Sequence, residues 1–165
     1  METQSDEILE LGGREYKTVK LNNKIWMAEN LSLLVSGSWF YNENAQYGAT
    51  FGRLYTWQAA MEACPAGWRL PTREDWSEML ESLGGEKQAC PALKAGGESG
   101  FEALFAGYRT QKGDFLSIER AADFWTSTEA GDSNAWLFYI IFKKEKVFRI
   151  IDDKRCGFSV RYIKE

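Results

Sequence analysis

Apolar residues recur at helical spacing in two segments of the first half of the chain. The first segment follows Thr56, a residue type that caps helix N-termini, and it ends at Pro65. The second follows Thr72, which stands three residues before Asp75 as in a capping box, and it ends at Gly84-Gly85. We therefore predict two amphipathic helices, whose apolar faces carry Trp57, Ala60, Met61 and Cys64 in the first and Trp76, Met79, Leu80 and Leu83 in the second.

Runs rich in β-branched and aromatic residues predict strands elsewhere. Residues 15–21 and 24–29 are predicted as a hairpin, because Asn22-Asn23 between them tolerates left-handed turn geometry. In the second half the predicted strands are residues 105–109, 124–128, 135–142, 147–151 and 157–163. Helices followed by strands favour an α+β fold, with the two helices packed on a mainly antiparallel, twisted sheet.

Three segments lack a clear period. Residues 36–52 are predicted as an ordered loop, because they mix glycine, serine and asparagine with aromatic residues. Residues 84–100 are rich in glycine and lysine and are predicted as a surface loop. Residues 1–11 are predicted as a flexible lead-in, which leaves residues 12–165 as one domain without an internal repeat.

Composition and charge narrow the possible functions. With 165 residues and 44% hydrophobic content, the chain can bury a substantial core. Its 24 acidic and 20 basic residues are spread along the chain and give a net charge of -4, so no nucleic-acid partner is expected. No apolar run approaches the roughly 20 residues that span a bilayer, so no membrane span is expected. Histidine is absent, which removes the usual general base and the commonest metal ligand.

The 3 cysteines leave at least one thiol unpaired. The cysteines are Cys64, Cys90 and Cys156, and we favour Cys64 with Cys156 as a structural pair, which the separation of their Cα atoms can decide. A cysteine-bound metal is not expected, because there is no Cys-x-x-Cys motif and no histidine to complete a site.

Short acidic segments are interpreted as turns. Glu129, Asp132 and Asn134 form the best local set of oxygen ligands for calcium, but we interpret them as a solvated turn. Asp152-Asp153 is interpreted as a turn between strands. No metal and no cofactor are therefore predicted.

Six phrases spread over nearly the whole chain resemble a known family when taken together and in order. They are IWMAENL (25–31), FGRLYTW (51–57), CPAGWRLPT (64–72), AGYR (106–109), FWTSTE (124–129) and GFSVR (157–161). With them the chain resembles the Fibrobacter succinogenes major paralogous domain family, which is similar to C-type-lectin-like and formylglycine-generating-enzyme-like folds.

The resemblance implies a C-type-lectin-like fold and an extracellular or cell-surface bacterial protein. Many members resemble lipoproteins, whose leader would not be part of this sequence. Relatives of the wider group include ligand-binding proteins whose C-terminal strands are diversified by retroelements. Members of the family often carry a cysteine shortly after GFSVR, where this chain has Tyr162. Either Cys156 replaces that cysteine or all thiols are free.

Tryptophans within the family phrases are interpreted as core anchors, because of their size and spacing. They are Trp26, Trp57, Trp68 and Trp125. These residues account for the fold and not for a partner.

Residues 134–151 hold the candidate ligand-binding site. Strict alternation along two neighbouring strands would place half of their aromatic side chains in water. Either this ribbon is covered on both faces, or its outer face is an exposed apolar patch that binds a partner. The predicted ligand-binding residues are Trp136, Phe138, Tyr139, Phe142, Phe148 and Arg149.

Three functions are compatible with these observations. The leading hypothesis is a non-enzymatic, secreted or cell-surface module that recognises a protein or glycan ligand through its C-terminal strands. The second is a retroelement-diversified variable receptor that uses the same ribbon. The third is an enzyme of the formylglycine-generating type, which is disfavoured because no cysteine lies in a basic, activating context. We predict no catalytic residue.

Overall fold

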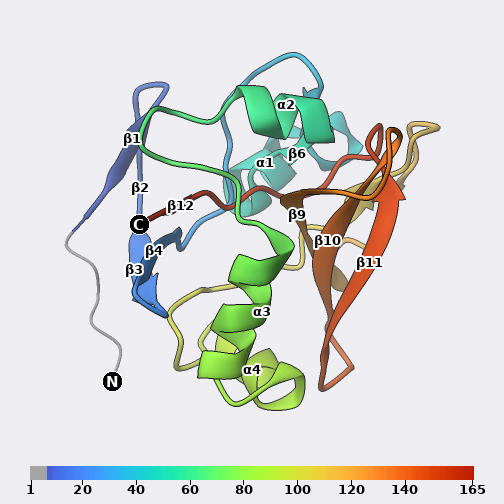
Figure 1. The fold of residues 1–165 in the computed structure, drawn as a ribbon. Coiled ribbons are helices and arrows are strands. Elements are labelled where there is room, and N and C mark those ends of the chain that lie inside the picture. The colour runs from blue at the N-terminus through green and yellow to red at the C-terminus, as the bar shows by residue number, and fades with distance from the viewer. Residues whose placement is uncertain (1–6) are drawn as a thin grey trace.

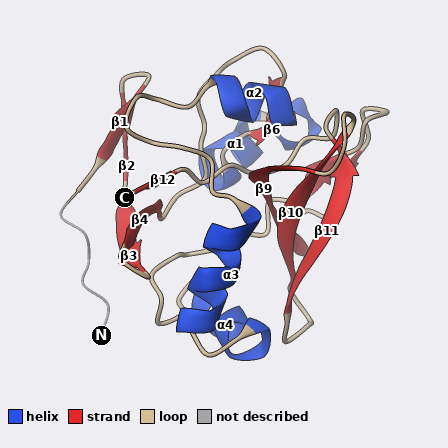
Figure 2. Ribbon diagram, viewed as in Figure 1, coloured by secondary structure: helices blue, strands red, loops and turns tan. Residues whose placement is uncertain are grey.

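Helices and antiparallel strands follow one another along residues 7–165, the part of the chain that the computed structural model describes (Figure 1). The helices in this part are η1, a 3-10 turn (Tyr41–Glu43), α1 (Ala45–Phe51), α2 (Trp57–Glu62), α3 (Arg73–Ser82) and α4 (Glu86–Leu93). The strands are β1 (Leu9–Leu11), β2 (Arg14–Tyr16), β3 (Thr18–Leu21), β4 (Lys24–Met27), β5 (Ser38–Trp39), β6 (Leu54–Tyr55), β7 (Tyr108–Arg109), β8 (Phe115–Leu116), β9 (Ala121–Glu129), β10 (Asn134–Ile141), β11 (Val147–Asp153) and β12 (Ile163–Lys164). This mixture of helices and antiparallel sheets confirms the predicted α+β class (Figure 2).

The predicted hairpin around Asn22-Asn23 is confirmed. β3 and β4 pair antiparallel with Leu21 opposite Lys24, and both asparagines have positive φ angles. Positive φ at both central residues is typical of the turn whose twist suits a two-residue hairpin. β12 pairs with the other edge of β4, so residues near the C-terminus complete this small sheet.

A further hairpin precedes it. β1 pairs with β2, and the side chain of Leu9 is buried in the core. The prediction of a flexible lead-in over residues 1–11 is therefore wrong from Leu9 onward, because an apolar side chain there has a core to join. Residues 1–6 of that segment lie outside the described residues.

Both predicted amphipathic helices are present as α2 and α3, but α2 ends at Glu62, before the predicted Cys64, and Met61 of its predicted apolar face is 40% exposed. The hydroxyl of Thr56 accepts a hydrogen bond from the Ala59 N–H at 3.2 Å, which caps α2. At α3 the hydroxyl of Thr72 accepts from the Asp75 N–H at 3.1 Å, and the Asp75 carboxylate accepts from the Thr72 N–H at 2.7 Å. These paired bonds satisfy N–H groups that a helix N-terminus leaves without partners. No helix within residues 7–165 has the length and apolar content needed to cross a bilayer.

Two segments predicted as loops contain regular structure. Residues 84–100 include α4, whose Pro91 weakens the helical signal in the sequence because proline lacks an N–H group. α4 nevertheless buries Cys90 and Leu93 in the same core as α3, so tertiary packing outweighs that signal. Residues 36–52 include β5, η1 and α1, where Tyr41 and Tyr47 pack edge to face at 5.3 Å.

The largest sheet has the order β11-β10-β9, and its strands are antiparallel. α3 and α4 lie side by side against one face of it, which we call the inner face (Figure 1). There the Trp76 ring of α3 stacks on the Phe138 ring of β10 at 5.1 Å with an interplanar angle of 9°. We call the opposite face, which carries Asp123, Tyr139 and Phe148, the outer face.

The outer face is covered over part of its area. Trp125 of β9 and Leu137 of β10 belong to a second apolar cluster together with Phe158, and the rings of Trp125 and Phe158 meet edge to face at 4.6 Å. Trp125 also donates its indole N–H to the Tyr55 carbonyl at 2.8 Å. The sheet is therefore buried on both faces near Trp125, as a continuous apolar run allows.

The segment before β12 crosses the interior of the molecule. The predicted strand over residues 157–163 is wrong in extent, because within it only Ile163 belongs to a strand and residues 157–159 make single bridges, such as Phe158 with Tyr55. Arg161 in this segment is 1% exposed. Its guanidinium donates to the Asn30 side chain at 2.7 Å and to the backbone carbonyls of Met27, Phe101 and Glu102.

Other predictions differ from the structure at element ends. The strand predicted over residues 105–109 is confined to Tyr108–Arg109, and Asp152-Asp153 forms the end of β11 and not a turn. Asp152 pairs with Ala135 and Asp153 with Asn134, so the ladder continues beyond the apolar run that the sequence shows. The core positions of Trp26 and Trp125 are confirmed, and Trp57 and Trp68 are half-buried against the cluster that contains Trp125.

The stack on Trp76 gives a test of the inner face. Replacing Phe138 by alanine should lower the free energy of unfolding by about 3–5 kcal/mol, because it leaves a cavity beside Trp76. Replacing Phe142, which is 57% exposed, should lower it by less than about 1 kcal/mol. Chemical denaturation of both variants measures these changes, and equal losses would contradict the assignment of Phe138 to the core.

Candidate functional site

The strand register divides the six predicted ligand-binding residues between two faces. Tyr139 lies opposite Phe148 on the outer face, and their rings stack at 5.2 Å with an interplanar angle of 18°. Phe138 lies opposite Arg149, and both point to the inner side of the sheet. Only Tyr139 and Phe148 of the predicted set therefore share one surface on the outer face.

Phe138 is not a surface residue, and its assignment to the binding site is corrected. Its side chain is 1% exposed and lies in the core formed with α3 and α4. The alternation along β10 turns it to the inner face, where Trp76 covers it. A ligand on the surface cannot reach this ring.

The other predicted residues lie apart from one another. Trp136 is half-buried beneath the guanidinium of Arg73, which lies 4.8 Å from its ring centre. Arg149 is exposed, and Phe142 follows the end of β10 and packs edge to face on Phe105 at 5.4 Å. Their role in binding stays a prediction.

A pocket of about 400 Å³ opens on the outer face, where the second apolar cluster ends. Its walls come from the sheet and from the segment between β7 and the start of β9. Most lining side chains are apolar or aromatic, and a few polar groups lie among them, as in ligand-binding pockets generally. The lining residues are Tyr108, Ser117, Arg120, Ala121, Asp123, Leu137, Tyr139, Ile141, Ile150, Asp152 and Phe158.

Asp123 is the unusual member of this lining. It lies in β9 directly opposite Tyr139 and is 6% exposed. Its Oδ2 atom has no hydrogen-bond partner among the described residues. Burial, and next the charge of Asp152, raise the pKa of Asp123 to about 8.

Backbone hydrogen bonds fix Asp123 in place. Its carbonyl accepts from the Ser159 N–H at 3.0 Å, and the Trp125 N–H donates to the Ser159 carbonyl at 3.2 Å. β9 is thus held on one edge by β10 and on the other by the crossing C-terminal segment. The carboxyl group is rigidly presented to the pocket by a buried strand.

Sequence reasoning missed both acids of the pocket. Asp123 is a single charged residue in the otherwise apolar run Ala121–Trp125, and an acid inside a buried strand is rare enough to be a signal. Asp152 was interpreted as a turn residue, whereas the register places it in β11 beside the pocket. Its position depends on strand pairing, which the sequence alone does not give.

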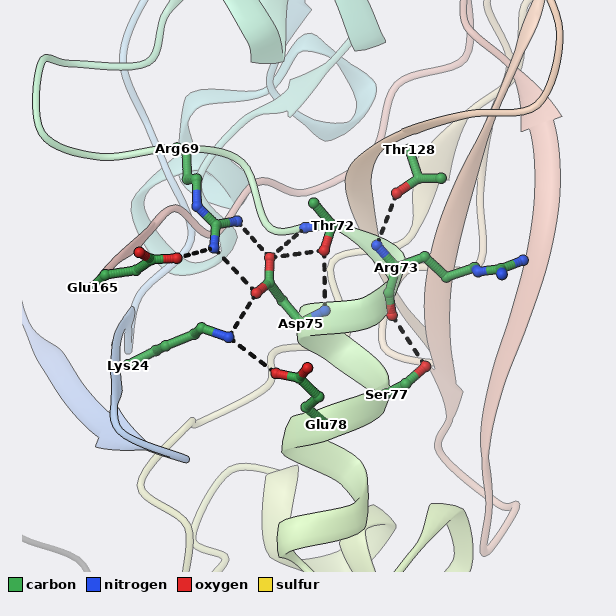
Figure 3. Close-up of polar contacts among 9 residues, drawn as sticks. All are labelled: Lys24, Arg69, Thr72, Arg73, Asp75, Ser77, Glu78, Thr128 and Glu165. Atoms are coloured by element: carbon green, nitrogen blue, oxygen red, sulfur yellow. Dashed lines mark hydrogen bonds and ion pairs between the residues drawn. The ribbon is translucent and has the colours of Figure 1, made fainter.

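A second cluster of charged side chains surrounds the N-terminus of α3 (Figure 3). The Asp75 carboxylate accepts from Arg69 and from the Thr72 hydroxyl and N–H, and it forms an ion pair with Lys24 at 2.9 Å. Burial opposes ionisation here, but these hydrogen bonds outweigh it and hold the pKa of Asp75 well below its usual range. Every group at its centre has a partner, so we interpret the cluster as a structural joint between α3, β4 and the C-terminus.

A hollow of about 710 Å³ between α4 and the β10–β11 hairpin is lined mainly by lysine side chains and their neighbours. The amine of Lys94 donates to the carbonyls of Phe142 at 3.1 Å and Lys144 at 3.2 Å. Lys146 forms an ion pair with Glu86 at 3.2 Å. Both amines therefore connect α4 to the β10–β11 hairpin. Among the residues that line the hollow, no buried polar side-chain atom lacks a hydrogen-bond partner.

All three cysteines are free, so the favoured disulfide between Cys64 and Cys156 is wrong. The Cys156 thiol contacts the side chains of Gln111 and Asp152, each at 3.6 Å, while the Cys64 thiol faces the Pro65 carbonyl of its own loop. Burial raises the pKa of Cys64 to about 11. Burial, and next the charge of Asp152, raise the pKa of Cys156 to about 12.

The side chain of Lys154 binds two oxygen atoms of the acidic turn at Glu129. The amine of Lys154 donates to the Glu129 carboxylate and to the Asp132 carbonyl, and it lies 4.3 Å from the ring centre of Trp57. A protein cation thus occupies the place that we considered for calcium. Within residues 7–165 no group of three His, Cys, Asp or Glu side chains is placed to hold a metal ion.

Comparison with known proteins gives one match. The family model described as the Fibrobacter succinogenes major domain matches residues 19–164. No curated protein and no solved structure matches the chain. The matched region runs from β3 to β12, so it contains every residue that lines the pocket.

The joint at α3 predicts a specific loss of stability. Asp75→Asn should lower the free energy of unfolding by roughly 2–4 kcal/mol, because it removes the negative charge that Arg69 and Lys24 share while the Thr72 hydroxyl still caps the helix. Glu74→Gln on the same turn is the matched control and should change it by less than about 1 kcal/mol. Urea denaturation compares the two, and similar small losses would contradict the structural role of Asp75.

The raised pKa of Asp123 predicts how stability depends on pH. Between its usual pKa and about 8 the unfolded chain loses this proton while the folded protein keeps it, so stability falls as pH rises through that window. Asp123→Asn removes this dependence and should gain roughly 2–4 kcal/mol relative to wild type from pH 5 to pH 8.

The chain has no histidine, so few other groups titrate in this window. Asp153→Asn is the control, because the Arg155 side chain holds the pKa of Asp153 below its usual range and its titration falls outside. The test is to measure the unfolding midpoints of wild type, Asp123→Asn and Asp153→Asn from pH 5 to pH 8. Parallel curves for wild type and Asp123→Asn would rule out a buried, protonated Asp123.

Proposed function

This chain belongs to the Fibrobacter succinogenes major domain family, and we propose that it is a non-enzymatic module that binds a protein or glycan ligand through the outer face of its β9–β10–β11 sheet. The observation that carries the proposal is the pocket on that face, which holds a buried acid without a partner. Soluble domains seldom leave such a group next to a formed cavity unless something binds there.

The rim of the pocket supports a binding role. Ile150 is 47% exposed beside the stacked rings of Tyr139 and Phe148, so apolar area continues from the pocket across the outer face. Aromatic side chains contribute large contact areas and lose little entropy when a partner covers them. Ligand contacts on this face would therefore combine apolar area with the acid at its centre.

The proposal includes the finer assignment of the fold as C-type-lectin-like and a location outside the cell or on its surface. Both rest on the family phrases in the sequence, above all CPAGWRLPT and GFSVR. In such a protein a rigid framework of buried tryptophans would carry the binding face, which agrees with the buried positions of Trp26 and Trp125.

The state of the thiols favours binding over catalysis by cysteine. The nucleophile in thiol chemistry is the thiolate, and burial raises the pKa of both Cys64 and Cys156 far above neutrality. Burial likewise raises the pKa of Cys90. These protonated thiols do not support the formylglycine-generating alternative.

Two adjacent isoleucines provide a matched test. The wild-type domain is first screened against a printed glycan array and a phage-displayed peptide library. Binding of the enriched ligands is then measured for Ile150→Glu on the outer face and for Ile151→Glu, which is 44% exposed on the opposite face. We expect Ile150→Glu to weaken binding by about tenfold or more and Ile151→Glu by less than about twofold.

Two outcomes would contradict the proposal. One is that neither library yields a ligand enriched over a heat-unfolded sample of the domain. The other is that the two variants lose affinity equally, which would place the ligand elsewhere on the molecule.

A further inference from the structure

Four buried side-chain atoms lack hydrogen-bond partners within the described part of the chain. Two are the indole nitrogens of Trp26 and Trp76, which lie among aromatic rings, and one is the Nε of Arg109, whose guanidinium stacks 3.8 Å from the Trp39 ring centre. The fourth, Asp123 Oδ2, is the acceptor of the set and the one that lines a pocket.

Two other buried charged groups, Arg161 and Asp75, have hydrogen-bond partners. The Arg161 guanidinium donates hydrogen bonds to the Asn30 amide oxygen and to backbone carbonyls. The Asp75 carboxylate accepts hydrogen bonds from Arg69 and Thr72 and forms an ion pair with Lys24. Because burying an unsatisfied polar group costs about 1–3 kcal/mol, such an exception calls for an explanation. A ligand that supplies the missing donor provides one.

The groups that face Asp123 favour a positive charge. Asp152 from β11 contributes a second carboxyl group, Tyr108 from β7 and Tyr139 from β10 contribute aromatic rings, and exposed Arg120 lies just before β9. No ion pair of Arg120 or of Asp123 is found among the described residues, and the Cys156 thiol contacts Oδ1 of Asp152 at 3.6 Å. Two acids thus oppose one exposed base, and aromatic rings attract cations.

We infer that the pocket receives the ammonium group of a lysine side chain from a protein ligand, with the Asp123 carboxylate as its counter-ion. This inference rests on the proposed function and names its ligand class. The aliphatic stem of the lysine would lie against Leu137, Ile141 and Ile150, and its charge would reach Asp123 at the base of the pocket.

A lysine fits these features better than other cations. A guanidinium binds carboxylates through two parallel hydrogen bonds to both oxygens, whereas Oδ2 of Asp123 is buried, so the single point charge of an ammonium suits this carboxyl group better. An amino sugar would place its hydroxyl groups against the aliphatic wall without partners. The pocket volume of about 400 Å³ is ample for one such side chain.

The charge state of Asp123 ties binding to pH. Burial holds the pKa of Asp123 at about 8 in the free protein, so an ammonium ligand must displace its proton. The lysine amine itself keeps its proton up to a pH of about 10. Affinity for the cation should therefore rise from pH 6 to pH 8 by about tenfold or more.

The test uses a lysine probe and its neutral isostere. Nα-acetyl-lysine methylamide is titrated into ¹⁵N-labelled full-length protein, and the same titration is run with the Nε-acetylated form, which has the same stem without the charge. Nα-acetyl-arginine methylamide and glucosamine test the other cations. Asp123→Asn removes the counter-ion, and Asp153→Asn is the control, because Asp153 is paired with Arg155 outside the pocket.

We expect the lysine probe to shift the amide signals of β9 and β10 around the pocket. It should bind about tenfold or more tightly than each of the other three probes, and Asp123→Asn should lose that difference. Asp153→Asn should keep the wild-type affinity within about twofold. Equal affinity for the neutral probe, wild-type affinity in Asp123→Asn, tighter binding of arginine or glucosamine, or no shift at the solubility limit would each overturn the inference.

Failure of the inference can be told apart from failure of the proposed function. In one outcome, library ligands lose affinity for Ile150→Glu while the lysine probe binds wild type and Asp123→Asn equally well. In that case the outer face binds ligands of another class. If Ile150→Glu has no effect and the lysine probe still depends on Asp123, the pocket acts without the apolar rim.

Discussion

A buried guanidinium at the centre of the molecule sets the positions of segments far apart in the sequence. Arg161 donates to Asn30, to the carbonyl of Met27 at the end of β4, and to carbonyls that follow α4. Burial lowers the pKa of Arg161 to about 9, so it remains charged at neutral pH and needs all of these acceptors. The crossing C-terminal segment is fixed as a result, and through Ser159 and Phe158 it holds β9 and forms one wall of the pocket.

The two faces of the β9–β10–β11 sheet have different roles. The inner face is covered by α3 and α4, with the stack of Trp76 on Phe138 at its centre. The outer face is covered only near Trp125, and beyond this contact lies the pocket that the buried Asp123 helps to line. A fold that satisfies Arg161 and Asp75 so fully, yet leaves Asp123 without a donor, is more easily explained by a ligand than by packing.

Local signals in the sequence were sufficient to predict much of the secondary structure. The Asn22-Asn23 turn, the caps at Thr56 and Thr72 and the apolar spacing of α2 and α3 each depend on residues close together in the chain. α4 was missed because Pro91 and the flanking glycines weaken its local signal, while its burial against α3 comes from tertiary packing.

The site was harder to predict, because it depends on which way each strand residue points. The sequence indicated the β10–β11 ribbon, but strand pairing turns Phe138 into the core and leaves Tyr139 on the outer face. Asp123 and Asp152 meet only through the three-stranded register. The most direct test is the carboxyl-carbon NMR titration of Asp123 without and with a saturating lysine probe. We predict a midpoint of about 8 that falls when the probe is bound; a midpoint at the ordinary aspartate value, or one that the probe leaves unchanged, would contradict this account.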